Sequence, residues 1–190
     1  MKYDQEYYII SPDFDIEGYS VIPSDSTGLR RFHYRELVYG EPALRFSTKN
    51  GQQLGDDIPM LFCTPSFIIS EDLKEIFDDS VYGGKLYPAI INDTMHHYLL
   101  INIYDSLDCW DRERSVYEID DPDDEAHVIK YSLNSAILDK IPESKRLIFK
   151  MGGDDLAPVV VHKTIKRKLE QKIPYLKFYC IESYELGDEY

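Results

Sequence analysis

The apolar positions of residues 67–89 recur in residues 159–181 at a constant offset of 92, without a gap. The clearest matches are Phe67 with Val159, Leu73 with Ile165, Phe77 with Leu169, and Val81 with Ile173. Only three of the 23 paired positions carry the same residue, so the repeat lies in the pattern rather than in the letters. Each copy predicts an apolar entry segment, a short amphipathic helix, a turn and a strand.

The two predicted helices cover residues 70–79 and 162–172. Ser70 is a candidate N-cap of the first helix, whose apolar residues at i, i+3 and i+4 form one buried stripe. In the second helix, Ile165 and Leu169 face inward and the lysines and arginine face outward. We therefore expect both helices to pack one face against a sheet.

Short runs of apolar and aromatic residues predict strands at 7–10, 19–22, 41–46, 86–91, 97–104 and 176–181. Proline and glycine interrupt the first 55 residues every 6–12 positions, a rhythm typical of short β elements. We expect a β-rich N-terminal arm or lobe at 1–55 and a repeated core at 56–190, or one continuous domain. The predicted fold class is α+β, with a mixed or antiparallel sheet and two short helices.

The chain has 190 residues and a formal net charge of −14. This charge argues against nucleic acids and anionic membranes as partners, because both need basic residues on the protein. It favours a basic protein partner, whose approach a negative field would accelerate. The first residues lack the apolar stretch of a signal peptide, and no apolar run approaches the length of a membrane span, so we expect a cytoplasmic protein.

The two predicted helices carry opposite charges. Residues 70–79 contain five acids and one lysine, a net charge of −4, whereas residues 162–172 contain five basic residues and one acid, a net charge of +4. Each helix alone is explained by an ordinary solvated face. The opposite net charges of the two helices suggest two surfaces with different roles.

The strongest local charge is acidic. Residues 105–125 contain ten acids and two arginines, and the density peaks in residues 118–125. Three interpretations stand: a solvated loop, a surface that captures a basic partner, and a metal site, which Pro122 disfavours because it disrupts the EF-hand spacing. The candidate partner-binding residues of this run are Asp120, Asp121, Asp123, Asp124 and Glu125.

Residues 108–115 follow the best predicted strand and contain the single tryptophan of the chain. Asp108 and Asp111 could pair with neighbouring arginines in an internal network, since carboxylate and guanidinium pair well in bidentate geometry. The same passage could instead be a recognition loop. In that case Asp108, Trp110 and Asp111 would contact the partner.

The sequence offers no constellation typical of an enzyme. Its three cysteines form no CxxC pair or zinc motif, and its five histidines are scattered. It also lacks HExxH, GxSxG and phosphate-loop motifs. His162, at the start of the second helix, is expected to be a capping or surface residue. We therefore predict neither catalysis nor a cofactor nor a bound metal.

The order of segments resembles a known family, the bacterial polymorphic-toxin immunity proteins of family eleven. The resemblance covers residues 60–187 and is carried by residues 65–74, 98–103, 105–115 and 158–162. Its most specific part is an apolar strand followed by Asp-Cys-x-Asp-x-x-x-Ser. The chain departs from the family pattern in its first 55 residues and in the acidic run.

The resemblance implies a small cytosolic protein that binds and neutralises a cognate toxin domain without catalysis. In this hypothesis, acids of the 118–125 and 108–114 segments meet basic residues of the toxin, and tyrosines and Trp110 supply buried anchors. A rival hypothesis is a scaffold or regulatory homodimer that pairs helix 70–79 of one copy with helix 162–172 of another. A DNA mimic is disfavoured because the acids cluster in one loop.

Overall fold

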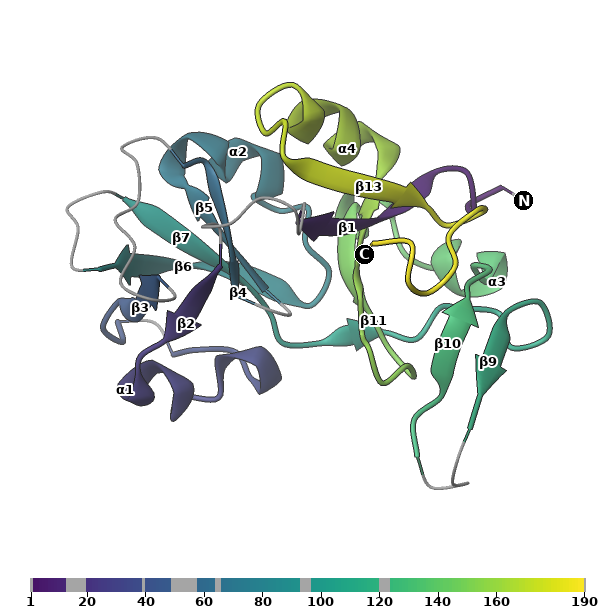
Figure 1. The fold of residues 1–190 in the computed structure, drawn as a ribbon, viewed down its shortest axis with the longest axis horizontal. Helices are drawn as coiled ribbons and strands as arrows, with labels where there is room; N and C mark the ends of the chain where they lie inside the picture. The colour runs from purple at the N-terminus through teal and green to yellow at the C-terminus, as the bar shows by residue number, and fades with distance from the viewer. Residues whose placement is uncertain are drawn as a thin grey trace.

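The computed structural model of the chain describes residues 2–12, 20–38, 40–48, 58–63, 66–92, 97–119 and 124–189. These residues form an α+β fold of two larger sheets, a separate β-hairpin and several short helices (Figure 1). The predicted fold class is thus confirmed. Both sheets are mixed, because each contains antiparallel pairs and one parallel pair.

The first sheet has six strands in the order β2-β3-β6-β7-β5-β4. Their bounds are Val21–Pro23 (β2), Leu44–Thr48 (β3), Gly84–Ile91 (β6), Tyr98–Ile103 (β7), Ser66–Ser70 (β5) and Met60–Cys63 (β4). A parallel bridge between Ser20 and Phe62 links its two outer strands, so this sheet curls back on itself.

The second sheet has five strands in the order β13-β1-β12-β11-β8. Their bounds are Leu176–Cys180 (β13), Tyr7–Pro12 (β1), Val159–His162 (β12), Ile148–Met151 (β11) and Ser106–Leu107 (β8). The remaining strands, Val116–Glu118 (β9) and His127–Lys130 (β10), pair only with each other among the named strands.

The helices are short. The α-helices are Asp25–Gly28 (α1), Lys74–Phe77 (α2), Ser135–Leu138 (α3) and Lys163–Glu170 (α4), and the 3₁₀ turns are Phe32–Tyr34 (η1), Glu71–Leu73 (η3) and Glu143–Lys145 (η4). Ser70 precedes η3, but its side chain makes no capping hydrogen bond. The capping role expected of His162 is confirmed, because its side chain accepts a hydrogen bond from the Thr164 backbone N–H.

The predicted internal repeat is present in three dimensions. In the first copy, β5, α2 and β6 follow one another, and β7 pairs antiparallel with both strands and lies between them. In the second copy, β12, α4 and β13 follow one another, and the strand between them is β1, which comes from the other end of the chain. An antiparallel strand, β4 or β11, flanks each copy on the same side.

The position of β1 changes the expected domain organisation. This strand lies inside the second sheet, whereas β2 and β3 belong to the first sheet. The described residues of 1–55 are therefore built into both sheets and do not form an arm or lobe of their own. The first strand of the chain thus lies between two of its last strands. Tyr8 of β1 pairs with Cys180 of β13 on one side and with Val161 of β12 on the other.

Hydrogen bonds run between the two copies in both directions. After α2, the carbonyl of Ser80 and the N–H of Tyr82 hydrogen-bond the N–H and carbonyl of Ile148 at the start of β11 (3.0 and 2.8 Å). After α4, the Tyr175 hydroxyl accepts from the Met60 N–H and donates to the Met60 carbonyl at the start of β4 (3.1 and 2.7 Å). The segment after each helix thus binds the strand that flanks the other copy.

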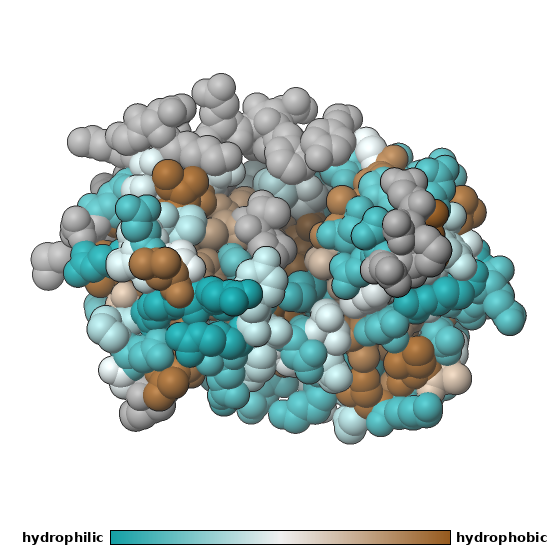
Figure 2. Space-filling view, turned by 90° about the horizontal axis from the view of Figure 1, so that it is seen from below, coloured by the Kyte–Doolittle hydropathy of each residue, from teal (hydrophilic) through white to brown (hydrophobic). Residues whose placement is uncertain are grey.

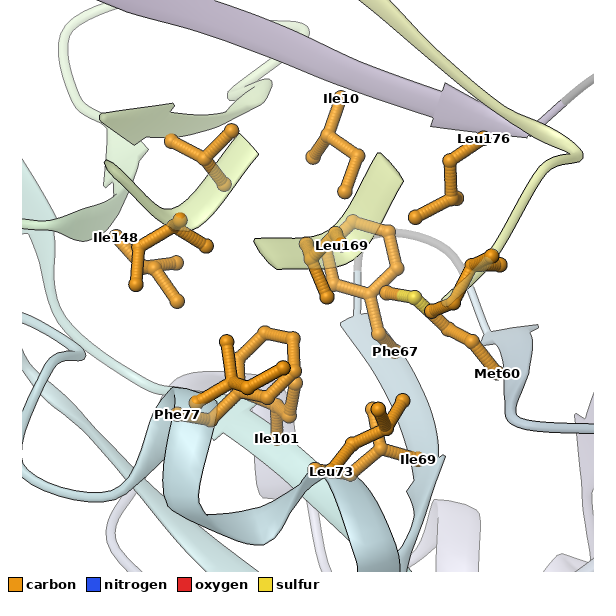
Figure 3. Packing of buried hydrophobic residues seen from close by; sticks show 14 of the residues in the cluster. Ile10, Met60, Phe67, Ile69, Leu73, Phe77, Ile101, Ile148, Leu169 and Leu176 are labelled. Atoms are coloured by element: carbon orange, nitrogen blue, oxygen red, sulfur yellow. The ribbon is translucent and has the colours of Figure 1, made fainter. Parts of the chain in front are cut away.

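Both copies share one hydrophobic core (Figure 3). Phe67, Leu73 and Phe77 of the first copy pack in the same cluster as Ile165 and Leu169 of the second. A second cluster covers the far side of the five-stranded sheet, and a third covers the far side of the six-stranded sheet. Burial of the shared cluster therefore joins the two copies in one body.

Candidate functional site

The β9–β10 hairpin projects from the body of the molecule (lower right in Figure 1). Its two strands pair antiparallel, with a register shift between Val128 and Lys130. The other edge of β10 is held by residues 154 and 155, through a parallel bridge between Ala126 and Asp154 and a hydrogen bond from Asp155 N–H to the Ala126 carbonyl (3.1 Å). The hairpin therefore has a fixed base.

Trp110 supports the hairpin from below. Its side chain is 1% exposed, and its indole N–H lies 3.1 Å from the carbonyl oxygens of both Gly152 and Gly153. The Tyr117 ring of β9 packs edge-on against it, with centroids 4.9 Å apart. Trp110, which the sequence proposed as an anchor for a partner, is buried and makes its contacts inside the protein.

The Asp–Arg pairs beside Trp110 form an internal network. This is the first of the two interpretations given above for residues 108–115. The Arg112 guanidinium lies 3.7 Å from the Trp110 ring centroid and pairs with both carboxylate oxygens of Asp108. Asp111 accepts from Arg114 Nε at 2.8 Å, and this hydrogen bond lowers the pKa of the Asp111 carboxyl. Asp108 stays half exposed, whereas Asp111 is mostly covered.

Asp154 anchors the hairpin from the other side. It is 1% exposed, accepts a hydrogen bond from the Tyr131 hydroxyl, and lies 3.3 Å from the Val128 backbone N–H. Burial raises the pKa of the Asp154 carboxyl, because the charged form is poorly solvated there. The hydrogen bonds from Tyr131 and Val128 act in the opposite direction and hold the carboxylate in place.

An acidic cavity opens beside the hairpin. It has a volume of about 470 Å³ and is lined by Glu118, Asp124, Glu125, His127 and Asp155. His127 Nδ1 lies 3.0 Å from Asp155 Oδ2, and this contact raises the pKa of the imidazole. Four carboxyl groups thus surround a space large enough for a basic side chain.

Two exposed hydrophobic residues accompany the acids. Val116 and Ile119, on and just after β9, are each 52% exposed. Figure 2 views the molecule from the side on which the hairpin projects, and this face is mostly hydrophilic with separate hydrophobic residues between. The hairpin therefore offers both charge and apolar surface to a partner.

The predicted site residues fall into three groups. Asp124 and Glu125 line the acidic cavity, and their role in partner binding stays a prediction. Asp120, Asp121 and Asp123 lie outside the described residues. Asp108, Trp110 and Asp111 form the support below the hairpin. His127 and Asp155 carry no local sequence signal for this site, because the pairing of Ala126 with Asp154 brings them together.

Three candidate nucleophiles of the described chain, Ser66, Cys63 and Cys109, are buried. Ser66 Oγ lies 3.0 Å from Nδ1 of His33, and burial lowers the pKa of that imidazole to about 4. Ser66 is only 2% exposed, which keeps substrates away from its hydroxyl. Burial also raises the pKa of the Cys63 thiol to about 11 and the pKa of Cys109 further still, so both thiols are poor nucleophiles at neutral pH.

Within the described ranges, no group of three or more His, Cys, Asp or Glu side chains is placed to hold a metal ion. None of the helices in this part of the chain is long and apolar enough to cross a membrane. No family model matches the chain, and no curated protein matches its sequence. The geometry of the hairpin and its cavity is therefore the main structural guide to function.

Proposed function

We propose that this protein is an immunity protein, which binds and neutralises a cognate bacterial toxin domain in the cytoplasm without catalysis. The observation that carries the proposal is the projecting hairpin with its acidic cavity, bordered by Glu118, Asp124, Glu125 and Asp155. The resemblance of residues 60–187 to the immunity family points the same way.

The chemistry of the site favours a basic protein surface as the partner. Carboxylates around a cavity of this size can surround a lysine or arginine side chain, and Arg pairs with carboxylates in bidentate geometry. Val116 and Ile119 add apolar area that a partner can cover. Because the whole chain carries a net charge of −14, its field would also speed the approach of a basic toxin.

A rigid base suits this role, because less entropy is lost when a pre-ordered surface binds. Trp110 packs against the Tyr117 ring of β9, and the Asp154 carboxylate accepts a hydrogen bond from the Val128 backbone N–H of β10. The partner then meets the described acids of the cavity, Glu118, Asp124, Glu125 and Asp155, on a pre-ordered base. The partner-binding residues proposed are Glu118, Asp120, Asp121, Asp123, Asp124, Glu125 and Asp155, with Asp108 at the margin.

The test is co-expression with the C-terminal domain of the polypeptide encoded immediately upstream. We expect growth rescue and co-purification with the natural chain. The variant Glu118→Lys/Asp124→Lys/Glu125→Lys should weaken binding by at least about tenfold, because it places like charges on the two surfaces. Titration of the purified domains by calorimetry measures this change.

The matched control is Asp72→Lys/Glu75→Lys/Asp78→Lys, which alters the net charge by the same amount on exposed residues around α2. Loss of binding in the hairpin variant alone assigns the effect to the site. Equal loss in both variants would mean that only the overall charge matters. Rescue that survives the hairpin variant would remove the acidic site from the mechanism.

A scaffold or regulatory module that acts through self-association is the second candidate. The observation that favours it is the pair of oppositely charged helices. That surface is separate from the hairpin in Figure 1.

A further inference from the structure

The outward side of the η3–α2 segment is acidic. Glu71, Asp72, Glu75 and Asp78 are all exposed, and none of them forms an ion pair with another described residue. Asp79, just beyond the helix, lies 3.8 Å from the Lys145 ammonium. This segment therefore presents several carboxylates whose charge is not neutralised locally.

The outward side of α4 is basic. Lys163 pairs with Glu6, and Lys166 pairs with Glu170 on the same helix. The other three basic residues are exposed and form no ion pair within the described part of the chain: Arg167, Lys168 and Lys172. These three charges are unusual in a chain with a net charge of −14, and they lie together.

The helices that carry these two faces pack against the same core. The inner sides of both helical segments enter the same core, through Leu73 and Phe77 on one and Ile165 and Leu169 on the other. Both helices lie at the top of the molecule in Figure 1. Their unpaired charged residues are exposed. This edge of the molecule is acidic at η3–α2 and basic at α4.

We propose that α2 and α4 form a self-complementary surface through which two copies of this chain dimerise. A two-fold axis that crosses the edge between the helices brings the acidic face of each copy onto the basic face of the other. The interface is then isologous, so every acid–base contact occurs twice. Stacking in any orientation that superimposes like helices would instead place carboxylates against carboxylates.

The size of the surface sets the strength of the dimer. α4 has eight residues and is therefore about 12 Å long, and α2 with η3 is of similar length. Such a contact belongs with small, transient interfaces, and ion pairs at a solvated surface contribute little each. The dimer is weak and sensitive to salt. It goes beyond toxin binding, because the hairpin lies at the opposite edge of the molecule and stays free.

The sign of the salt effect separates this dimer from non-specific association. Two copies with a net charge of −14 repel each other, so added salt would promote contact if the overall charge dominated. If the complementary faces dominate, added salt weakens the dimer. The dissociation constant should rise by at least about tenfold between roughly 0.05 and 0.5 M salt.

Sedimentation equilibrium of the purified chain, over a range of concentrations at low and high salt, tests the proposal. Arg167→Glu/Lys168→Glu/Lys172→Glu should be monomeric, and so should Glu71→Lys/Glu75→Lys/Asp78→Lys. An equimolar mixture of the two variants should form a heterodimer at low salt, because each supplies the charge that the other has lost. Circular dichroism checks that both variants are folded.

A salt-sensitive dimer, lost in each variant and restored in the mixture, establishes the surface. A natural chain that stays monomeric at all concentrations overturns the proposal and leaves the two faces to another partner. A dimer that persists in both variants, or that strengthens with salt, also overturns it. None of these results depends on a toxin, so toxin binding is tested separately.

Discussion

A single residue, Trp110, shows how a side chain that is common in interfaces can serve inside a protein. Its ring fills the space between the β9–β10 hairpin and the five-stranded sheet, and its N–H is bound by two glycine carbonyls. Arg112 covers its remaining face and is itself held by Asp108. The residue therefore supports the acidic site from below.

Replacing Trp110 tests this role. Trp110→Phe removes the N–H and should lower the free energy of unfolding by about 1–3 kcal/mol, while Trp110→Ala should cost about 3–5 kcal/mol through lost packing. Urea unfolding monitored by circular dichroism measures both. Leu29→Ala is the control, because Leu29 is 84% exposed and its truncation should change stability by less than about 0.5 kcal/mol. A Trp110→Ala variant with an unchanged free energy of unfolding would contradict the supporting role.

At this scale the sequence predicted part of the site. The density of acids in residues 118–125 correctly indicated Asp124 and Glu125 as members of an acidic cluster. It did not indicate Asp155, because that residue joins the cluster only through the pairing of Ala126 with Asp154. The burial of Trp110 was equally hidden, since its hydrogen-bond partners lie 42 and 43 residues further along the chain.

At the scale of the elements, local sequence patterns predicted the positions of strands and helices better than they predicted which strands pair. The strands predicted at 7–10, 86–91, 97–104 and 176–181 correspond to β1, β6, β7 and β13. The first helix is shorter than expected and begins with a 3₁₀ turn, and α1 and α3 were missed because four residues show no periodicity. The insertion of β1 between β12 and β13 depends on distant pairing, which no local pattern encodes.

The position of β1 leads to a prediction about connectivity. In the first copy, the central strand β7 follows β6; in the second, β1 occupies the same place beside β13. Moving residues 2–12 from the start of the chain to a position after residue 189, through a flexible linker, should therefore give a folded protein. Deleting them should unfold the second sheet, because β12 and β13 lose their common partner.

Circular dichroism and thermal unfolding measure the fold and stability of the relocated-strand and deletion variants. A chain carrying residues 2–12 in scrambled order after residue 189 is the control and should behave like the deletion. A deletion that melts like the natural chain would show that β1 is dispensable. A relocated strand that fails to restore the fold would show that its original connection is required.

For the whole molecule, the important feature is that both copies share one core. Each contributes its helix and its first strand to the same cluster, and the loops after the helices bind the opposite copy. The repeat in the sequence predicted two equal units. It could not predict that the two units face each other. The apolar pattern shows which side of each unit is buried, but not what covers that side.

A matched pair of substitutions tests the shared core. Phe77→Ala and Leu169→Ala change equivalent positions that are 2% and 0% exposed, and we expect losses of about 3–5 and 2–5 kcal/mol respectively. Because the core is common, each variant should still unfold in a single transition, with calorimetric and van't Hoff enthalpies equal. Val116→Ala, at an exposed site, should change little. Two separate transitions would show that the copies are independent.

The place of β1 in the second sheet also determines the order in which the protein can form on the ribosome. At about 5–20 residues per second, β1 waits roughly eight to thirty seconds for β12, because Tyr8 pairs with Val161. The six-stranded sheet can assemble during this interval, since its strands lie between residues 21 and 103. The nascent chain meanwhile exposes the Tyr-Tyr-Ile-Ile segment of β1, which makes it a natural binding segment for chaperones during synthesis.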